Sequence, residues 1–514
     1  MSSAFRRTLP RRPDLDQQKK LARELLRAFR AGDPEAIARV RAALPDEPAP
    51  SLTSAQYVLA REYGFASWRA LREHIEQTTA QRIPPIERFK HAVERGDTAT
   101  VRVLLKEHAD VRAKVNAPIF SFDSPALLQS SDEHPDLVDV LLEFGADPNR
   151  RSDWWAGGFH PLYVVRGAAA ERLLAAGAVP DACAAANLDR PDLLRAMLAE
   201  SPARVHERGG DGQTPLHFAR SREVVDLLLG AGADIDARDV DHRSTPAQWM
   251  LGDGPGARMA LAAYLVERGA SVDIFLAAAL GLTDRVRTML EADPSLLRLH
   301  TGLGAYGAQP PSAQHIYQWT IGGHRTPLHT AAKFGREDTL AVMERFATSV
   351  ERLLIACHRG DRDAAGSVLA EHPRLMDSLD PISRAAMTAE AWDSNARAVE
   401  LMIELGFDPA AKSMITDGGS ALHSAAWQGS AECVAAILRH PSARALLTVR
   451  DPTYKGTPLG WCLHGSLNRR NPRGDYAAVA RLMIDAGAPL DAEVTEREMS
   501  EEVEAVIEAA SASR

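Results

Sequence analysis

The sequence predicts an all-α protein in which helix–turn–helix units, joined by short β-turn fingers, stack into a curved solenoid with helical caps. Two recurring patterns support this prediction: a helix start of the type Thr-Pro-Leu-His, and a helix end of two apolar residues followed by Gly-Ala. The composition agrees, because an aromatic share of 6% and many Ala-Ala pairs favour closely packed helices over a β-rich core. The patterns recur often enough for about twelve units.

The helix ends repeat most clearly. Glycine after the apolar pair suits the left-handed backbone of a residue that ends a helix, and a second set of ends replaces this glycine by proline. The first set comprises LLEFGADPN (from 141), LLAAGAVPD (173), LLGAGADID (228), LVERGASVD (265), MIELGFDPA (402) and MIDAGAPLD (483). The second set comprises LAESPARV (198), LEADPSLL (290), LAEHPRLM (369) and LRHPSARA (438).

The helix starts complete the unit. Thr or Ser caps a helix and Pro fits its first turn. The starts are TPLHFA (214), TPAQWM (245), TPLHTA (326), SALHSA (420) and TPLGWC (457). They resemble the ankyrin repeat family, whose signature is T-P-L-H-x-A. The resemblance covers about residues 86–492 and implies a finger, an inner helix, a tight turn and an outer helix in each unit.

Several units depart from this pattern. At 177–187, 269–280 and 345–357 an outer helix runs almost directly into the next inner helix, so we expect no finger there. We divide the chain into a helical N-terminal capping region (1–80), a solenoid (81–494) and an acidic C-terminal capping helix and tail (495–514). The segment AREYGFASWRALREHIE (60–76) is similar to a module of bacterial ankyrin proteins, which implies a bacterial source.

Several classes of protein are disfavoured. No apolar run reaches the roughly 18 residues that a membrane span needs, and the basic N-terminus lacks the apolar segment of an export signal. The four scattered cysteines form no CxxC pair, which indicates a reducing cytoplasm. The basic start and acidic end are interpreted as solvated caps; the alternative is a basic arm that touches nucleic acid or acidic lipid, which no recognition motif supports. We expect no nucleic acid partner, no membrane partner and a monomer.

No complete catalytic set is present. The histidines of the TPLH slot (His217, His329 and His423) are expected to make structural hydrogen bonds, and the cysteines to be small buried groups. Phosphate-binding loops, HEXXH and calcium loops are absent from the sequence. A metal site from His300, His315 and His324 is disfavoured because no carboxylate or cysteine stands at a ligand-like spacing. We therefore expect no cofactor, and favour a protein that is not an enzyme.

Three insertions break the repeat and carry the candidate site. They are RSDWWAGGFH (151–160), the 28-residue connection 298–325, and HGSLNRRNPRGDY (464–476). Long connections in compact folds tend to be functional or disordered, and aromatic side chains argue against disorder. Inner-helix tryptophans could add to the same concave face. The candidate partner-binding residues are Trp154, Trp155, His160, Tyr306, His315, Tyr317, Trp319, His324, Trp427 and Trp461.

The function then depends on what these aromatic residues do. The first hypothesis is a cytoplasmic scaffold that binds a protein partner through its concave groove and finger insertions. The second is a small-molecule pocket, or an atypical enzyme, built by the insertion 298–325 over the inner helices. A bacterial effector acting on a host protein is a third hypothesis, without a visible secretion signal. Alternatively, the aromatic residues fill gaps that irregular units leave in the core.

Overall fold

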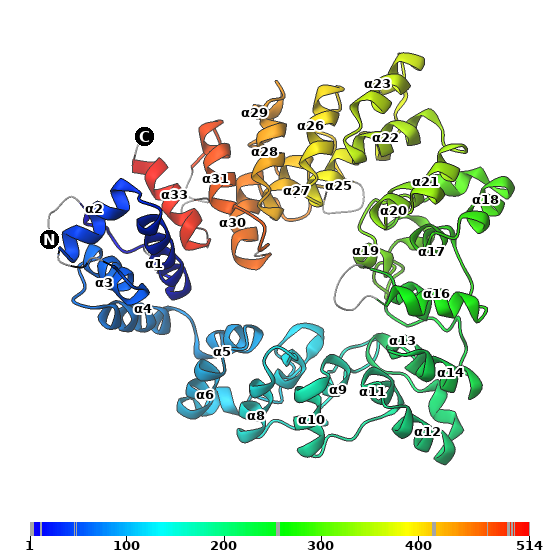
Figure 1. Ribbon diagram of the computed structural model, residues 1–514, viewed down its shortest axis with the longest axis horizontal. Helices are drawn as coiled ribbons and strands as arrows, with labels where there is room; N and C mark the ends of the chain where they lie inside the picture. The colour runs from blue at the N-terminus through cyan, green and yellow to red at the C-terminus, as the bar shows by residue number, and fades with distance from the viewer. Residues whose placement is uncertain are drawn as a thin grey trace.

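The chain folds into helix pairs that follow one another around a ring-like path, so that its last helix returns to its first (Figure 1). The computed structural model describes residues 5–512 except 11–12, 46, 48, 253–257, 414–417, 470, 491–493, 495–496 and 498. Within this part the regular structure is helical, and extended pairing is confined to isolated bridges such as Gln309–Ser312. The predicted helical solenoid is thereby confirmed.

The solenoid has an inner and an outer row of helices. The inner row is α5 (Pro85–Glu94), η3 (Ala126–Gln129), α9 (Pro161–Val164), α11 (Ala182–Asn187), α13 (Pro215–Phe218), α15 (Pro246–Trp249), α17 (Ile274–Leu280), α20 (Pro327–Lys333), α22 (Ser349–Arg359), α25 (Ala386–Trp392), α27 (Ala421–Gln428) and α30 (Pro458–Asn468). The outer row is α6 (Thr98–Glu107), α8 (Pro135–Glu143), α10 (Gly167–Ala175), α12 (Pro191–Glu200), α14 (Arg222–Gly230), α16 (Met259–Glu267), α18 (Thr283–Ala292), α21 (Glu337–Glu344), α23 (Arg362–Glu371), α26 (Ala396–Glu404), α28 (Ala431–Leu438) and α31 (Tyr476–Asp485).

Shorter helices lie in the connections. They are α7 (Ala109–Arg112), η2 (Ser121–Asp123), η4 (Pro202–His206), η5 (Gly210–Gly212), η6 (Pro294–Arg298), η7 (Gly304–Tyr306), α19 (Tyr317–Thr320), η8 (Met376–Ser378), α24 (Pro381–Arg384) and α29 (Ala443–Leu446). In Figure 1, inner helices such as α13 and α20 face the middle of the ring, whereas outer helices such as α14 and α18 form its rim.

The capping residues act as the helix starts predict. Thr214 and Ser420 each form a reciprocal capping box with the histidine three residues later. The Nε2 atom of His217 donates to the carbonyl of Ser244 on the next finger (3.1 Å), and that of His423 to the carbonyl of Gly456 (3.3 Å). These histidines therefore link consecutive repeats, as the resemblance implies.

The three connections expected to lack a finger are short. α10 ends at Ala175 and α11 begins at Ala182, and α16 is separated from α17 by the same interval. The third connection is shorter still, because α21 ends at Glu344 and α22 already begins at Ser349. At this last connection the hydrophobic core also changes over, because one cluster of buried side chains runs from Phe89 to Ile355 and the next from Leu353 to Ile507.

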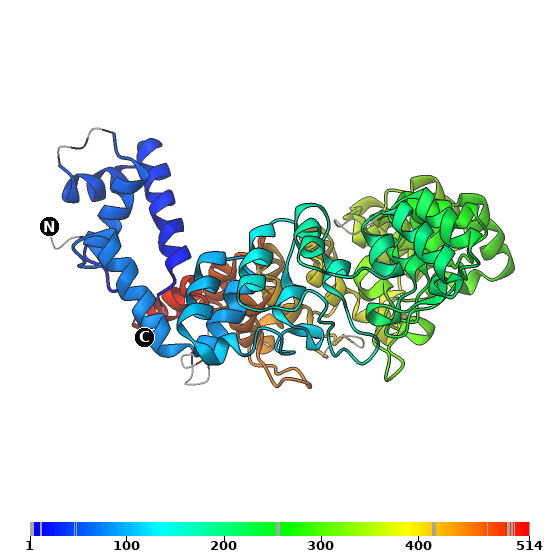
Figure 2. The ribbon, with the colours of Figure 1, turned by 90° about the horizontal axis from the view of Figure 1, so that it is seen from below.

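The N-terminal helices are α1 (Leu15–Arg30), α2 (Pro34–Ala43), α3 (Leu52–Glu62) and α4 (Trp68–Arg82). They bury small hydrophobic clusters of their own and project from the plane in which the solenoid curves (Figure 2). The last described helix is α33 (Glu501–Ala512), which packs on α31. Residues 495–496, 498 and 513–514 of the expected C-terminal cap lie outside the described part.

The two ends of the chain meet. The backbone N–H of Asp14 donates to Glu501 Oε2 (2.7 Å), the side chain of Gln18 bonds the same carboxylate, and Lys20 pairs with Glu502. The N-terminal region therefore contacts the helix at the opposite end of the solenoid, which closes the ring.

Candidate functional site

The insertion 151–160 presents aromatic rings beside a neighbouring finger. The indole N–H of Trp154 donates to Asp211 Oδ1 (3.0 Å). The Trp154 ring packs edge-on against Phe122, with 5.2 Å between ring centroids, and lies 6.2 Å from the ring of Trp155. Trp154 is thereby fixed in place, whereas Phe122 (51% exposed) and Trp155 (47% exposed) face solvent.

The insertion 298–325 supplies another exposed tryptophan. Trp319 lies on the single-turn helix α19 and is 57% exposed. Its ring contacts His242 edge-on, with 4.7 Å between centroids, and His242 in turn contacts Trp249. The imidazole of His242 therefore supports an indole that is otherwise open to solvent.

Two carboxylates join the two insertions. Asp211 and Asp241 occupy consecutive fingers, and their side chains are only 7% and 4% exposed. Their Oδ2 atoms lie 3.9 and 3.7 Å from Nε2 of His242. We refer to these neighbouring residues together as the aromatic–acidic strip: Phe122, Trp154, Trp155, Asp211, Asp241, His242 and Trp319.

Backbone hydrogen bonds hold the long insertion on the fingers. The N–H of Val240 donates to the carbonyl of Asp211 (2.8 Å), which aligns the two fingers. The N–H of Ala313 donates to the carbonyl of Asp241 (2.8 Å), and the hydroxyl of Ser312 to that of Val240 (2.8 Å). The strip is thus a rigid surface formed by segments distant in sequence.

Three of the candidate residues fill the core instead. Tyr317 is fully buried and its hydroxyl donates to the carboxylate of Asp273, with both oxygens at 3.0 Å. His315 is buried beside Tyr317, and its Nδ1 accepts from the N–H of that residue (3.3 Å). Tyr306 stacks on Tyr317 at 5.7 Å and contacts Phe275. These rings pack the gap under the insertion, which is the alternative that the sequence left open.

Two candidate histidines are also buried. Nδ1 of His160 accepts from the N–H of Leu162 (3.1 Å), so His160 caps a helix. His324 has a left-handed backbone (φ 59°) and hydrogen-bonds Ser413 Oγ through Nε2 (2.9 Å). Burial lowers the pKa of His160 to about 4 and that of His324 to about 3, which keeps both imidazoles neutral at pH 7.

The remaining candidates lie elsewhere on the inner row. Trp461 is 9% exposed, and its indole N–H donates to Asp451 Oδ2 (2.9 Å). Trp427 is half-buried between Trp461 and His464, with centroid distances of 6.0 and 5.6 Å. The structure therefore separates this pair on α27 and α30 from the aromatic–acidic strip.

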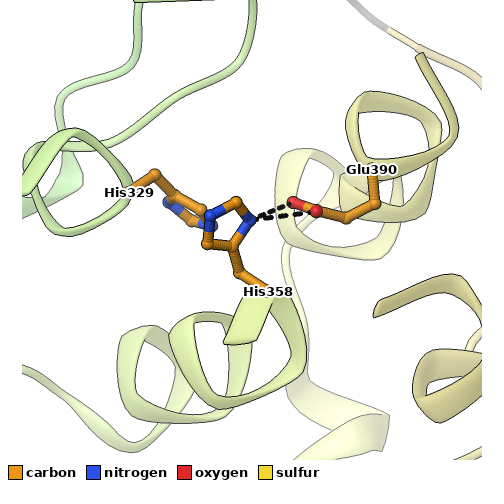
Figure 3. Close-up of side chains that lie close together, drawn as sticks. All are labelled: His329, His358 and Glu390. Atoms are coloured by element: carbon orange, nitrogen blue, oxygen red, sulfur yellow. Dashed lines mark hydrogen bonds and ion pairs between the residues drawn. The ribbon is translucent and has the colours of Figure 1, made fainter. Parts of the chain in front are cut away.

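A polar cluster that the sequence did not single out lies at the changeover between the two hydrophobic clusters. Figure 3 shows His358 between His329 and Glu390, with both carboxylate oxygens facing Nδ1 of His358 (3.0 and 3.2 Å). Glu390 also accepts from Arg325 and from the amide of Asn395 (2.8 Å). The carboxylate is thus saturated by donors that include a guanidinium, which suits a structural ion-pair network better than a metal site.

Two surface pockets lie away from the long insertion. One pocket of the described part lies between α31 and α33, where Arg481, Glu502 and Val506 contribute, and another beside α14, where Arg195 and Glu223 contribute. Neither is lined by a residue of 298–325. The side chains under this insertion pack against one another, and the accessible surface above them is the strip.

The chain was compared with known proteins. The family model of the ankyrin repeat matches residues 211–240. The match begins at Asp211 and ends one residue before Asp241. A search of curated proteins found no match. Among the described helices, none combines the length and apolar character that crossing a bilayer would demand. The match identifies one ankyrin repeat within a solenoid of stacked helix pairs.

Proposed function

We propose that this chain is a binding scaffold that holds a segment of a protein partner against the aromatic–acidic strip. The carrying observation is the exposure of large apolar side chains at one place. Of the nine exposed large hydrophobic residues in the described part, Phe122, Trp155, Val240 and Trp319 lie on or directly beside the strip. Exposed apolar groups gathered in this way mark interaction sites more often than scattered ones do.

The rigid support of these side chains favours binding. An anchor binds well when its own rotamer is already fixed, because less conformational entropy is lost on association. Trp319 rests on His242, and Trp155 rests on Trp154, which is itself hydrogen-bonded to Asp211. Tryptophan is also the side chain most enriched at the energetic centres of protein interfaces. We therefore expect a partner segment with apolar side chains that pack on the two exposed indoles.

The four cysteines are all buried and unpaired, which fits our proposal of a reducing, cytoplasmic location. The partner is then a protein of the same compartment. Besides the strip, the inner helices that face the ring interior offer a concave surface for this partner.

Affinity capture with the tagged full-length chain tests this proposal. We expect a specific partner to be retained by the wild type and lost from the Trp155→Ala/Trp319→Ala double variant, with far-UV circular dichroism unchanged. Loss of one central anchor typically costs at least about 2 kcal/mol, or about 30-fold in Kd. Tyr454→Ala is the matched control, because Tyr454 is 67% exposed on a finger outside the strip. Equal capture by the double variant and the control would contradict the proposed surface.

A further inference from the structure

We propose that Asp211, Asp241 and His242 form a binding site for a divalent cation of the zinc or manganese class. One ligand atom from each of the three residues lies within 4.8 Å of the other two. Two carboxylates and one imidazole are ligands that both ions accept in proteins. The proposal goes beyond partner binding and does not depend on it.

The hydrogen bond of the histidine fixes which nitrogen is available. Nδ1 of His242 lies 2.8 Å from the carbonyl oxygen of Gln314. A carbonyl can only accept, so Nδ1 carries the proton and the lone pair of the neutral ring is on Nε2. Metal-binding histidines commonly donate their other N–H to a backbone carbonyl in this manner. His242 thus has the tautomer and the second contact of a metal ligand.

The lone pair faces two anionic oxygens. Oδ2 of Asp241 and Oδ2 of Asp211 lie 3.7 and 3.9 Å from Nε2, which is too far for a hydrogen bond. The other oxygen of each carboxylate already accepts a donor, from Ala313 N–H (3.3 Å) and from the indole of Trp154 (3.0 Å). Among the described residues, neither carboxylate forms an ion pair with Lys or Arg.

A cation between the three atoms would compensate the charge of the two buried carboxylates. Carboxylates more than nine-tenths buried are costly without a compensating charge. Metal–ligand bonds of about 2.1 Å place two ligands of a tetrahedral ion about 3.4 Å apart. The observed separations from Nε2 therefore need to shorten by only a few tenths of an ångström.

The ligands are held in position before any ion arrives. The carbonyl of Asp211 accepts from the N–H groups of Val240 (2.8 Å) and Asp241 (3.2 Å), and Asp211 itself has a left-handed backbone (φ 56°). Asp239 accepts from the N–H groups of His242 and Ser244, both at 2.7 Å, which fixes the turn that presents the imidazole. A strained, non-glycine residue tied down by its neighbours is a feature often found at functional sites.

The second cluster of potential ligands lacks these properties. Glu390 pairs with the buried guanidinium of Arg325, whose charge would repel a cation. Within the described residues neither Asp211 nor Asp241 pairs with an arginine or a lysine, and the side chain of His242 is 11% exposed, which leaves access from solvent. Three protein ligands leave at least one coordination position open for water.

Calorimetric titration of EDTA-treated, dialysed full-length protein with ZnCl2 and with MnCl2 tests the proposal. We expect one saturable equivalent for at least one of the two ions. Asp241→Asn keeps the acceptor for Ala313 N–H, and both it and His242→Gln should weaken binding by more than the 10–100-fold typical of losing an outer-shell contact. The controls Asp284→Asn and His372→Gln alter exposed residues and should bind as the wild type does.

Hydrogen exchange of the wild type with and without the ion locates the site independently of any variant. Protection is expected in the fingers 209–213 and 239–243. The absence of a saturable equivalent, unchanged binding by Asp241→Asn and His242→Gln, or protection confined to other segments would each overturn the proposal. Since only purified protein and a metal salt are used, the outcome is separate from that of partner capture.

Discussion

Replacing Arg325 by Met will loosen the solenoid between α20 and α25. The side chains of Arg325 and Glu390 are 4% and 2% exposed, so the ion pair between them is shielded from solvent. Arg325 also donates to the carbonyl of Ala389 (3.1 Å) and pairs with Asp393 at 2.5 Å. Removing one partner of a buried ion pair costs about 3–5 kcal/mol because the other charge remains buried. Glu390 keeps its bonds to His358 and Asn395, so we expect the lower end of this range.

The loss should be local, because each repeat of a solenoid contacts mainly its neighbours. A single midpoint for a chain of this length would not report it, so hydrogen exchange followed by mass spectrometry is the appropriate assay. A loss of about 3 kcal/mol corresponds to roughly 100-fold faster exchange in peptides from α22 and α25. Peptides from α13 and α14 serve as the internal reference and should exchange at the wild-type rate.

A compensating variant distinguishes a buried charge from a packing defect. In Arg325→Met/Glu390→Met both charges are absent, so exchange should return most of the way to the wild-type rate. Wild-type exchange rates in α22 and α25 of the single variant would refute the reasoning. A double variant that exchanges faster than the single one would show that packing, and not the isolated carboxylate, is responsible.

The same pair sets a pH dependence. Burial alone would raise the pKa of Glu390, but the nearby Arg325, with help from His358, outweighs burial and lowers that pKa below its ordinary value of 4.5. A carboxyl whose pKa is lower in the folded state stabilises the fold fully above the unfolded pKa. This contribution is therefore complete above about pH 4.5 and is lost as the pH falls through the folded pKa.

Two further predictions concern the ring closure and the strip. Burial raises the pKa of Glu501 to about 7, so the docked carboxyl binds a proton that an exposed carboxyl releases, and docking of the chain ends should strengthen as the pH falls from 8 to 5. X-ray scattering tests this, because the radius of gyration should decrease as the docked form becomes more populated. The neutral variant Glu501→Gln should stay docked at pH 8. A radius of gyration that does not change with pH, or an open ring in Glu501→Gln at pH 8, would contradict the prediction. A Cβ on Gly157 would lie 2.3 Å from the carbonyl oxygen of Gly209, so Gly157→Ala should destabilise by about 1–3 kcal/mol in thermal unfolding. Gly145→Ala shares the positive φ but meets open space, and equal melting temperatures for the two would refute the clash.

The sequence predicted the repeat architecture well because its signals are local. A Thr or Ser cap, a Pro in the first turn and a Gly after the last turn each act within a few residues, so TPLH and GAD mark helix bounds directly. The same locality limited the prediction for Tyr317 and Trp319. These residues stand two positions apart in one insertion, yet the first is fully buried and the second is 57% exposed. Which ring faces the core depends on Phe275 and Asp273, which precede Tyr317 by more than forty residues.

The acidic residues of the strip could have been predicted from the repeat pattern in the sequence. Asp211 and Asp241 stand just ahead of the helix starts at Thr214 and Thr245, in consecutive fingers. Stacked repeats bring equivalent finger positions together, so two acidic tips in successive units predict two neighbouring carboxylates. His242 follows Asp241 directly and completes the group. The long insertion then determines the tautomer through Gln314, which the repeat pattern alone does not indicate.

The missing finger before α22 explains why the polar network stands where it does. After His217 and His423, the next finger supplies a carbonyl that accepts from Nε2. After His329 the chain passes from α21 to α22 in four residues, and the ring of His358 lies 4.9 Å from that of His329 instead. His358 donates onward to Glu390, which Arg325 neutralises. A contact between the two imidazole rings thus takes the place of the backbone contact between repeats, at the point where the hydrophobic core is divided. The buried ion pair stands beside the connection that lacks a finger, so its removal is expected to open this connection first.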